Sequence, residues 1–201
     1  MFSSLRPWVT SALCVLVLHT GCSDDLKWSA VESMIRANVG DVSQITTDSL
    51  AERLAAQRDT YPEALASDSD ASSSRTQLPV LLLDARQPEE YAVSHLRGAV
   101  RVDPNATSFP ELDSLSRERS IVVYCSVGYR SAQVTKRLRE QGYAASNLRG
   151  SIFRWANEGR PVVRGDSVVR EVHPYDDTWG DLLRPDLRAY TPGNRDSSAV
   201  P

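Results

Sequence analysis

Two continuous apolar runs, each followed at once by a chemically active side chain, constrain the fold of this 201-residue chain more than any other feature. The first run covers residues 80–83 and is followed by Asp84. The second covers residues 121–124 and is followed by Cys125. Neither run alternates polar with apolar side chains, which is typical of strands buried on both faces of a parallel sheet. Parallel strands need helical crossovers, so we expect an α/β fold.

The remaining segments supply the expected crossovers. Helical patterns cover residues 28–39, 89–96, 132–142 and 152–158, and another helix is expected from a Thr47–Asp48 cap. Shorter strands are expected at 42–45 and 98–102, with a strand end near 147–150. The length suits one domain with extensions. We therefore expect a single domain whose central parallel sheet is flanked by helices.

Composition changes in two places outside this alternation. Near residues 57–77 the centre of the segment, 67–74, has no large apolar side chain, so we expect a flexible surface insertion. Residues 164–201 form a C-terminal extension that begins with an expected turn at 164–166. We expect its apolar residues, among them Trp179 and Leu183, to pack on the domain.

The first 22 residues resemble an export signal. We expect residues 23–41, which follow it, to form a helical extension. Arg6 precedes a short apolar run at 12–18, which is well below the roughly 20 apolar residues that cross a bilayer. The Gly21–Cys22 junction resembles a lipoprotein lipobox, although His19 stands where that motif prefers Leu. We expect an exported, periplasmic protein attached to the membrane only through lipid on Cys22. The alternative is an ordinary signal peptide that leaves Cys22 as a free thiol.

Cys125 stands alone in the body of the chain. Of the three cysteines, Cys14 lies inside the signal and Cys22 at its end, so no structural disulfide is expected even after export. A lone thiol in an oxidising compartment is vulnerable unless it is used, which makes Cys125 a candidate for chemistry. The net charge of −3, with both signs interspersed, provides no field that would attract nucleic acid.

The residues after Cys125 suit a cradle for an anion. Backbone N–H groups between a buried strand and a helix can curl inward, and the helix N-terminus adds partial positive charge that favours a thiolate. The helix dipole contributes only about 0.3–1 kcal/mol, up to about 2 when partly buried, so several amides and a cation are needed. Gly128 permits a tight bend, Arg130 supplies the cation, and Ser131 is expected to cap the helix.

The order Cys125-x-x-Gly128-x-Arg130-Ser131 after an apolar strand resembles the active loop of single-domain rhodaneses, which are sulfurtransferases. The resemblance covers residues 42–163, which it implies form a rhodanese-like domain. It includes, in family order, residues 81–86, 89–91, 94–99, 148–151 and 155–162.

This resemblance implies that Cys125 takes a sulfane sulfur from a small donor such as thiosulfate or a persulfide. Cys125 would hold the sulfur as a persulfide and pass it to a thiol or cyanide acceptor. Asp84 and Arg86 resemble the supporting pair of the family, and neither metal nor organic cofactor is implied. The residues expected to bind the transferred sulfur are Ser126, Val127, Gly128, Tyr129, Arg130 and Ser131.

Three alternatives stay open at this point. Phosphatases and arsenate reductases of the same fold place five residues between Cys and Arg, whereas four separate Cys125 from Arg130. A rhodanese-like module that only binds a partner or senses redox state usually lacks the Cys, which this chain retains. The third alternative is that Cys125 is only a buried packing residue, which would give no structural reason for the glycine and the arginine that follow it.

Overall fold

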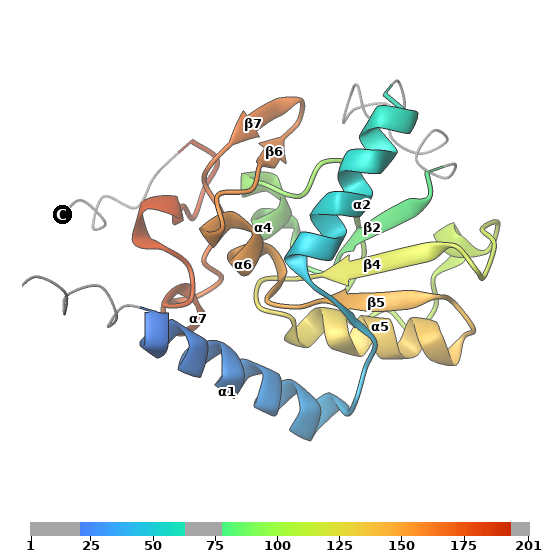
Figure 1. Cartoon of the computed structure of the whole chain (residues 1–201), viewed down its shortest axis with the longest axis horizontal. Helices are drawn as coiled ribbons and strands as arrows, with labels where there is room; N and C mark the ends of the chain where they lie inside the picture. The colour runs from blue at the N-terminus through green and yellow to red at the C-terminus, as the bar shows by residue number, and fades with distance from the viewer. Residues whose placement is uncertain (1–20, 63–77, 194–201) are drawn as a thin grey trace, which may run out of the picture.

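The structure, a computed structural model, describes residues 21–62 and 78–193 of the chain (Figure 1). Within these residues a five-stranded sheet has the order β1-β5-β4-β2-β3, and every neighbouring pair is parallel. The expected α/β fold with a central parallel sheet is thus confirmed. The strands are β1 Gln44–Ile45, β2 Val80–Asp84, β3 Val100–Arg101, β4 Ser120–Tyr124 and β5 Ala145–Leu148.

Helices on both sides of the sheet supply the crossovers that parallel strands require. Those longer than four residues are α1 Gly21–Val39, α2 Thr47–Thr60, α4 Pro88–Val93, α5 Tyr129–Glu140 and α6 Ser151–Asn157. Short turns of helix follow at η2 Pro110–Leu112, α7 Asp177–Gly180 and η3 Pro185–Leu187. α1 lies along one edge of the molecule, with α7 near its N-terminal end (Figure 1).

The two central strands separate two apolar cores because successive side chains point to opposite faces. Val80 and Leu82 of β2 join one core with residues of α1, α2 and α6. Leu81 and Leu83 join the other core with Val134 of α5 and with the 102–115 segment. Every residue of β2 is buried, as the continuous apolar run predicted.

Several element boundaries differ from the sequence-based expectations. Thr46, rather than Thr47, caps α2 by accepting a hydrogen bond from the amide of Ser49. α2 continues to Thr60 because Gln57 is buried and its Oε1 accepts a hydrogen bond from the Val80 amide, 2.7 Å away. The start of the predicted insertion near 57–77 was therefore placed too early, and residues 63–77 lie outside the described part of the chain.

The helix that follows β2 is also shorter than the pattern at 89–96 predicted. It ends at Val93, because Ser94 has an extended backbone and His95 pairs with Val163. Val163 belongs to an antiparallel hairpin that the sequence did not predict. This hairpin consists of β6 Val162–Arg164 and β7 Ser167–Val169. The expected turn at 164–166 lies in this hairpin.

Both extensions share the core of the domain. Trp28, Val31, Ile35 and Val39 of α1 are buried at the three- and four-residue spacing expected from the sequence. Val172, Leu183 and Leu187 from the C-terminal extension belong to the same apolar core. Elements on both sides of residues 42–163 therefore contribute to one apolar core.

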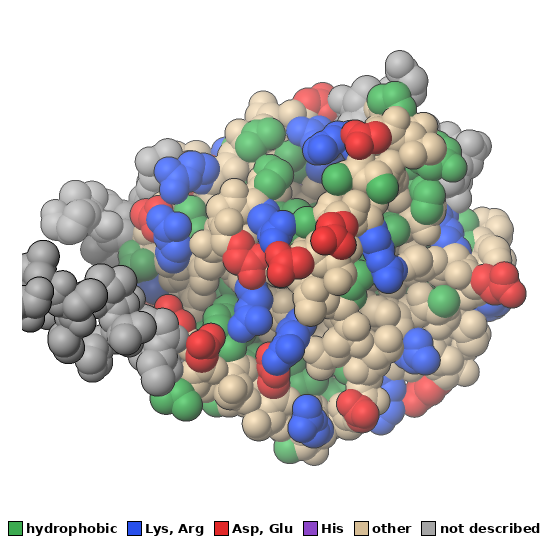
Figure 2. Space-filling model, viewed as in Figure 1, with side chains coloured by type: hydrophobic (Ala, Val, Ile, Leu, Met, Phe, Trp, Pro, Cys, Tyr) green, Lys and Arg blue, Asp and Glu red, His purple; other side chains and the backbone are tan. Residues whose placement is uncertain are grey.

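The N-terminal predictions fall mostly outside the described residues. Residues 1–20 are not described, and Cys22 lies in the first turn of α1 with no description of its side chain. None of the described helices combines the length and apolar character needed to span a bilayer. On the face shown in Figure 2, acidic and basic side chains are interspersed rather than gathered in a patch of one sign.

Candidate active site

β4 delivers Cys125 to the carboxyl-terminal edge of the sheet, where ligands bind in open α/β folds. The chain then turns into α5 through Gly128, whose φ of +115° lies where L side chains are rarely found. A Cβ added there would lie 3.3 Å from Cδ1 of Ile35 on α1. The loop thus needs glycine both for its conformation and for the close approach of α1.

The loop wraps around the sulfur of Cys125. The Sγ atom of Cys125 accepts a hydrogen bond from the Gly128 amide at 3.1 Å and lies 3.4 Å from Oγ of Ser131. The amides of Ser126 and Val127 bond to no other described residue. Those two amides therefore remain for an anionic ligand or solvent, which fits the predicted cradle.

Opposing effects set the pKa of the Cys125 thiol. Burial raises it, because a thiolate loses solvation. The charge of Arg130 and hydrogen bonds from Ser131 and Gly128 lower it by more, so the pKa lies below that of an ordinary cysteine. The site therefore favours the thiolate, the nucleophilic form of cysteine.

Arg130 is held by a carboxylate from another element. Its two terminal nitrogens donate to Oε2 and Oε1 of Glu90 at 2.6 and 2.8 Å, and Nη2 also donates to Oγ of Ser126 at 2.9 Å. Ser126 in turn donates to Glu90 at 2.8 Å. Burial raises the pKa of Glu90, but Arg130 lowers it further, so the carboxylate stays charged. Arg130 thus braces the loop, and its charge is largely balanced by Glu90.

Asn147 of β5 ties the two ends of the loop together. Its Nδ2 donates to the carbonyl oxygen of Gly128 at 3.1 Å, and its Oδ1 accepts from Oγ of Ser131 at 2.6 Å. A hydroxyl has one hydrogen, so Ser131 cannot donate to Asn147 and to Cys125 at once. The shorter contact identifies Asn147 as the resting partner. Ser131 therefore does not cap α5, whose N-cap is Gly128 without a side-chain bond.

The start of α6 secures the strand side of the loop. Ser151 has a φ of +52°, and its Oγ accepts a hydrogen bond from the Cys125 amide at 3.1 Å. The amides of Ile152 and Phe153 donate to the carbonyls of Cys125 and Ser126. Because these backbone groups are satisfied by α6, the loop is fixed from both sides.

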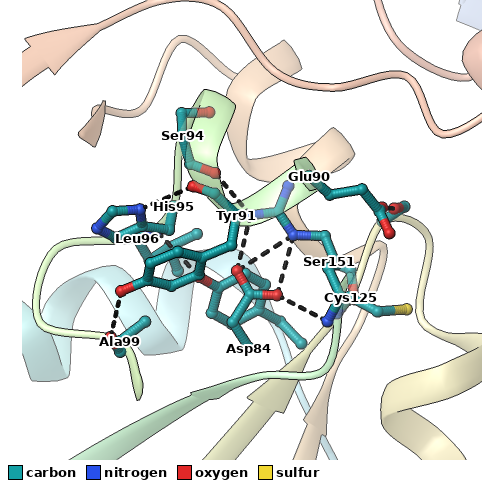
Figure 3. A network of polar contacts seen from close by, with 12 residues as sticks. Asp84, Glu90, Tyr91, Ser94, His95, Leu96, Ala99, Cys125 and Ser151 are labelled. Atoms are coloured by element: carbon teal, nitrogen blue, oxygen red, sulfur yellow. Dashed lines mark hydrogen bonds and ion pairs between the residues drawn. The ribbon is translucent and has the colours of Figure 1, made fainter. Parts of the chain in front are cut away.

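Asp84, the last residue of β2, forms a fully buried ion pair with Arg86. Nε of Arg86 donates to both carboxylate oxygens of Asp84, and its Nη2 donates to Oδ2 at 2.7 Å. Nη2 also donates to the carbonyl of Ser94 at 2.6 Å. In Figure 3 the sulfur of Cys125 points away from Asp84. The supporting role that the family resemblance implied for this pair stays a prediction.

His95 belongs to the same framework. Its ring stacks on Tyr91 with 3.8 Å between centroids, and Nδ1 lies 3.1 Å from the carbonyl oxygen of Tyr91 (Figure 3). The described residues contain no group of three or more His, Cys, Asp or Glu side chains placed to hold a metal ion.

A small pocket of about 100 Å³ opens above the thiol. One side is the active loop, with Val127 and Tyr129 beside Cys125. The other side is formed by Tyr175 and Trp179 of the C-terminal extension. Cys125 is only 1% exposed and packs in one of the two apolar cores, yet it also lines this pocket.

A larger cavity of about 300 Å³ lies elsewhere, between α2 and the β6–β7 hairpin. It is lined mainly by apolar side chains, including Leu54 and Trp155, and does not reach Cys125. We place the active site at the smaller pocket, because the activated thiol is there.

The predicted loop residues are brought together, and three kinds of partner were missed from the sequence. Asn147 lies in a strand, where a single polar residue gives no signal. Ser151 was noticed only as part of a family-like stretch. Tyr175 and Trp179 were not predicted to line the pocket, because no pattern links residues 50 and 54 positions after Cys125 to it. Trp179 was expected to pack on the domain, and it does.

Comparisons with known proteins agree with this geometry. Residues 67–158 match the Rhodanese-like domain family. A protein of Allochromatium vinosum named "Sulfurtransferase" is 32% identical over 123 residues, which are 61% of this chain and 95% of that protein. A tRNA uridine(34) hydroxylase of Enterococcus faecalis is 35% identical over 106 residues, 48% of this chain but only 32% of that protein.

Among solved structures, a rhodanese-like domain protein from Staphylococcus aureus aligns with 26% identity and a TM-score of 0.42. The alignment covers 56% of this chain and 90% of that one. The match to the Allochromatium protein spans nearly all of that relative at more than 30% identity, and residues 67–158, which match the family, include the loop that carries Cys125. The chain therefore belongs to the rhodanese-like sulfurtransferase family.

Proposed function

We propose that this protein moves a sulfane sulfur from a small donor to a thiol or cyanide acceptor through a persulfide on Cys125. One observation carries the proposal. The Sγ of Cys125 lies at the base of a pocket, accepts a hydrogen bond from the Gly128 amide, and has a lowered pKa. These are the requirements of a nucleophile that must also tolerate negative charge in its product.

The first half-reaction charges the enzyme. The Cys125 thiolate attacks the outer sulfur of thiosulfate, a new S–S bond forms, and the S–S bond of thiosulfate breaks. Sulfite leaves with the electron pair of the broken bond. The terminal sulfur of the persulfide is then an anion next to the amides of the active loop, which stabilise it.

The second half-reaction discharges the enzyme. The acceptor, for example cyanide, attacks the terminal sulfur and leaves as thiocyanate. The electron pair of the persulfide bond returns to Cys125, which is again a thiolate. Neither half-reaction consumes an oxidant, a reductant or a cofactor.

The same site is less suited to phosphoryl chemistry. A phosphate ester would need a cation directed at its oxygens, but both terminal nitrogens of Arg130 donate to Glu90. The loop also has one residue fewer between Cys125 and Arg130 than the phosphatases of this fold. Hydrolysis of an aryl phosphate that depends on Cys125 would restore that alternative.

Mass spectrometry tests the proposal directly. We expect treatment of the full-length protein with thiosulfate or polysulfide to add one sulfur atom to the peptide that contains Cys125. Cys125→Ser should abolish this adduct, whereas the control Cys22→Ser should retain it. Absence of the adduct with every donor would instead favour a non-catalytic module that binds a partner or senses redox state.

We also propose that the protein is exported and held at the membrane through lipid on Cys22, with no spanning helix. In support, α1 begins at Gly21, and the first buried residue among 24–39, the part of α1 whose side chains the structure describes, is Trp28. Six residues of helix rise about 9 Å, so a lipid on Cys22 would hold the domain near the bilayer. Labelling cells with an alkyne-bearing fatty acid should mark the wild type but not Cys22→Ser. Wild-type protein without label would contradict this proposal.

A further inference from the structure

The outer wall of the sulfur pocket comes from a part of the chain that lies beyond the family match. That match ends at residue 158, whereas Tyr175 and Trp179 line the pocket opposite the active loop. The wall is therefore a feature of this chain's own extension, and the family assignment does not explain it.

Tyr175 holds an unusual backbone conformation. Its φ is +71°, which is an outlier for a bulky side chain. Its side chain is 44% exposed, so core packing does not account for the conformation. The ring instead lies over the guanidinium of Arg130, with Cζ 4.7 Å from the ring centroid. Backbone strain of this kind is found where a side chain must be held at a functional position.

Local hydrogen bonds fix the backbone at both aromatic residues. The Tyr175 amide donates to Nδ1 of His173 at 3.0 Å, and the His173 ring packs edge-on against Tyr190. Burial lowers the pKa of His173, which keeps Nδ1 unprotonated and able to accept. Asp176, the residue after Tyr175, caps α7 because its side chain accepts a hydrogen bond from the Trp179 amide at 2.9 Å.

Hydrogen bonds also join this segment to the rest of the domain, one before Tyr175 in the chain and one after Trp179. Oγ of Ser94 donates to the carbonyl of Glu171 at 2.5 Å, and Nδ2 of Asn157 donates to the carbonyl of Leu182 at 2.8 Å. Val172, which lies between Glu171 and His173 in the chain, is completely buried. The aromatic wall is therefore a built part of the structure and not a loose tail.

The size of the enclosed space limits what can reach the sulfur. The pocket measures about 100 Å³. Pockets that enclose drug-sized ligands measure about 300–1,000 Å³. An inorganic anion of a few atoms fits such a space, whereas a peptide persulfide would have to place most of its bulk against Tyr175 and Trp179.

We propose that Tyr175 and Trp179 are specificity-determining residues that select a small inorganic sulfur donor such as thiosulfate over an organic persulfide such as that of glutathione. This inference rests on the proposed sulfur transfer to Cys125. It adds the class of donor and assigns its selection to residues outside the matched family region.

Single-turnover charging of Cys125 tests the inference, because no acceptor is present to react with the donor directly. The full-length wild type and two variants, Tyr175→Asn and Trp179→Leu, are each mixed with thiosulfate or with glutathione persulfide. The rate constant for formation of the Cys125 persulfide is measured by mass spectrometry at several donor concentrations. Asn tolerates a positive φ, so Tyr175→Asn removes the ring with little change to the backbone. Tyr61→Asn, which removes an exposed ring at the C-cap of α2, is the matched control.

We expect the wild type to prefer thiosulfate. Each pocket variant should lower the ratio of thiosulfate to glutathione persulfide rate constants at least tenfold, chiefly through weaker saturation by thiosulfate and faster reaction with the persulfide. Tyr61→Asn should leave the ratio unchanged. If a pocket variant lowered the rate constant for persulfide formation equally with both donors, the aromatic wall would have only a structural role, and the inference would be overturned. A wild type that charges with neither donor would overturn the proposed function and this inference with it.

Discussion

The side-chain amide of Asn147 donates a hydrogen bond to the carbonyl oxygen of Gly128, 3.1 Å away, and so links β5 to the turn of the active loop. Asn147 is 1% exposed, and its other side-chain atom accepts from Ser131. One side chain thus determines where the Gly128 amide, the donor to Cys125, is held.

Asn147→Ala should weaken both the fold and the site. The substitution takes the acceptor from the buried Ser131 hydroxyl and one of two donors from the Gly128 carbonyl, which keeps its bond from the Ala132 amide. A buried unsatisfied group costs about 1–3 kcal/mol. We expect urea denaturation to show a loss of that size in the free energy of unfolding. Sulfur transfer should fall about tenfold under conditions where the variant remains folded. An active, equally stable variant would contradict this account of the loop.

The reactivity of Cys125 should reveal its lowered pKa. Because the thiolate is the reactive form, the rate of alkylation by iodoacetamide should rise with pH to a midpoint below that of an ordinary cysteine. Ser131→Ala should shift this midpoint upward only if Ser131 donates to the thiolate. If Ser131 instead stays bonded to Asn147, the midpoint should not move, which makes this variant a direct test of the two competing contacts.

The Glu90–Arg130 pair should impose a pH dependence on stability. Arg130 holds the pKa of Glu90 below its usual value, so the pair stabilises the fold fully above about pH 4.3, and this stability is lost as pH falls through the folded pKa. We expect the unfolding free energy of wild type to decline in that acidic range. Glu90→Gln should show a shallower decline, measured by denaturant melts at a series of pH values.

Breaking the same pair from the other side should be more costly. Arg130→Met leaves the carboxylate of Glu90, whose side chain is 1% exposed, without its counter-charge. Removing one partner of a buried pair costs about 3 kcal/mol. The double variant Glu90→Gln, Arg130→Met should be more stable than Arg130→Met alone. Equal stability of the two would show that the pair contributes little.

Gly128→Ala separates two reasons for a glycine. Both Gly128 and Gly142 have a positive φ, but a Cβ at Gly142 meets nothing within 4 Å, whereas one at Gly128 meets Ile35. A positive φ costs an L residue about 1–2 kcal/mol. Gly142→Ala should lose about that amount of stability and keep its activity. Gly128→Ala should lose more stability and also activity, measured by denaturant melts and persulfide formation.

The sequence predicted the parts of this molecule whose physical cause is local. The apolar runs of β2 and β4 could not be confused with half-exposed strands, and the turn from Cys125 into α5 needed a glycine. The β6–β7 hairpin was missed because Ser167–Val169 is largely exposed and has no apolar pattern. The extension of α2 to Thr60 depends on a bond between Gln57 and Val80, and no local signal reports such a bond.

The site was predictable in its loop but not in its surroundings. Cys125, Gly128 and Arg130 follow each other at a spacing that indicates their chemistry. The role of Arg130 changed in the structure, because Glu90, 40 residues away, takes up its terminal nitrogens. Tyr175 shows the limit most clearly, since an aromatic residue gives no sequence signal of a left-handed backbone.

The close approach of α1 to Gly128 has a practical consequence for dissecting the protein. Ile35 packs against the turn at Gly128, and Tyr175 lines the pocket beside the active loop, yet both lie outside residues 67–158. A chimaera that transplants only the matched stretch would carry the reactive cysteine without its backing helix or its aromatic cover. Such a graft should be a poor sulfur carrier even when every residue of its loop is retained.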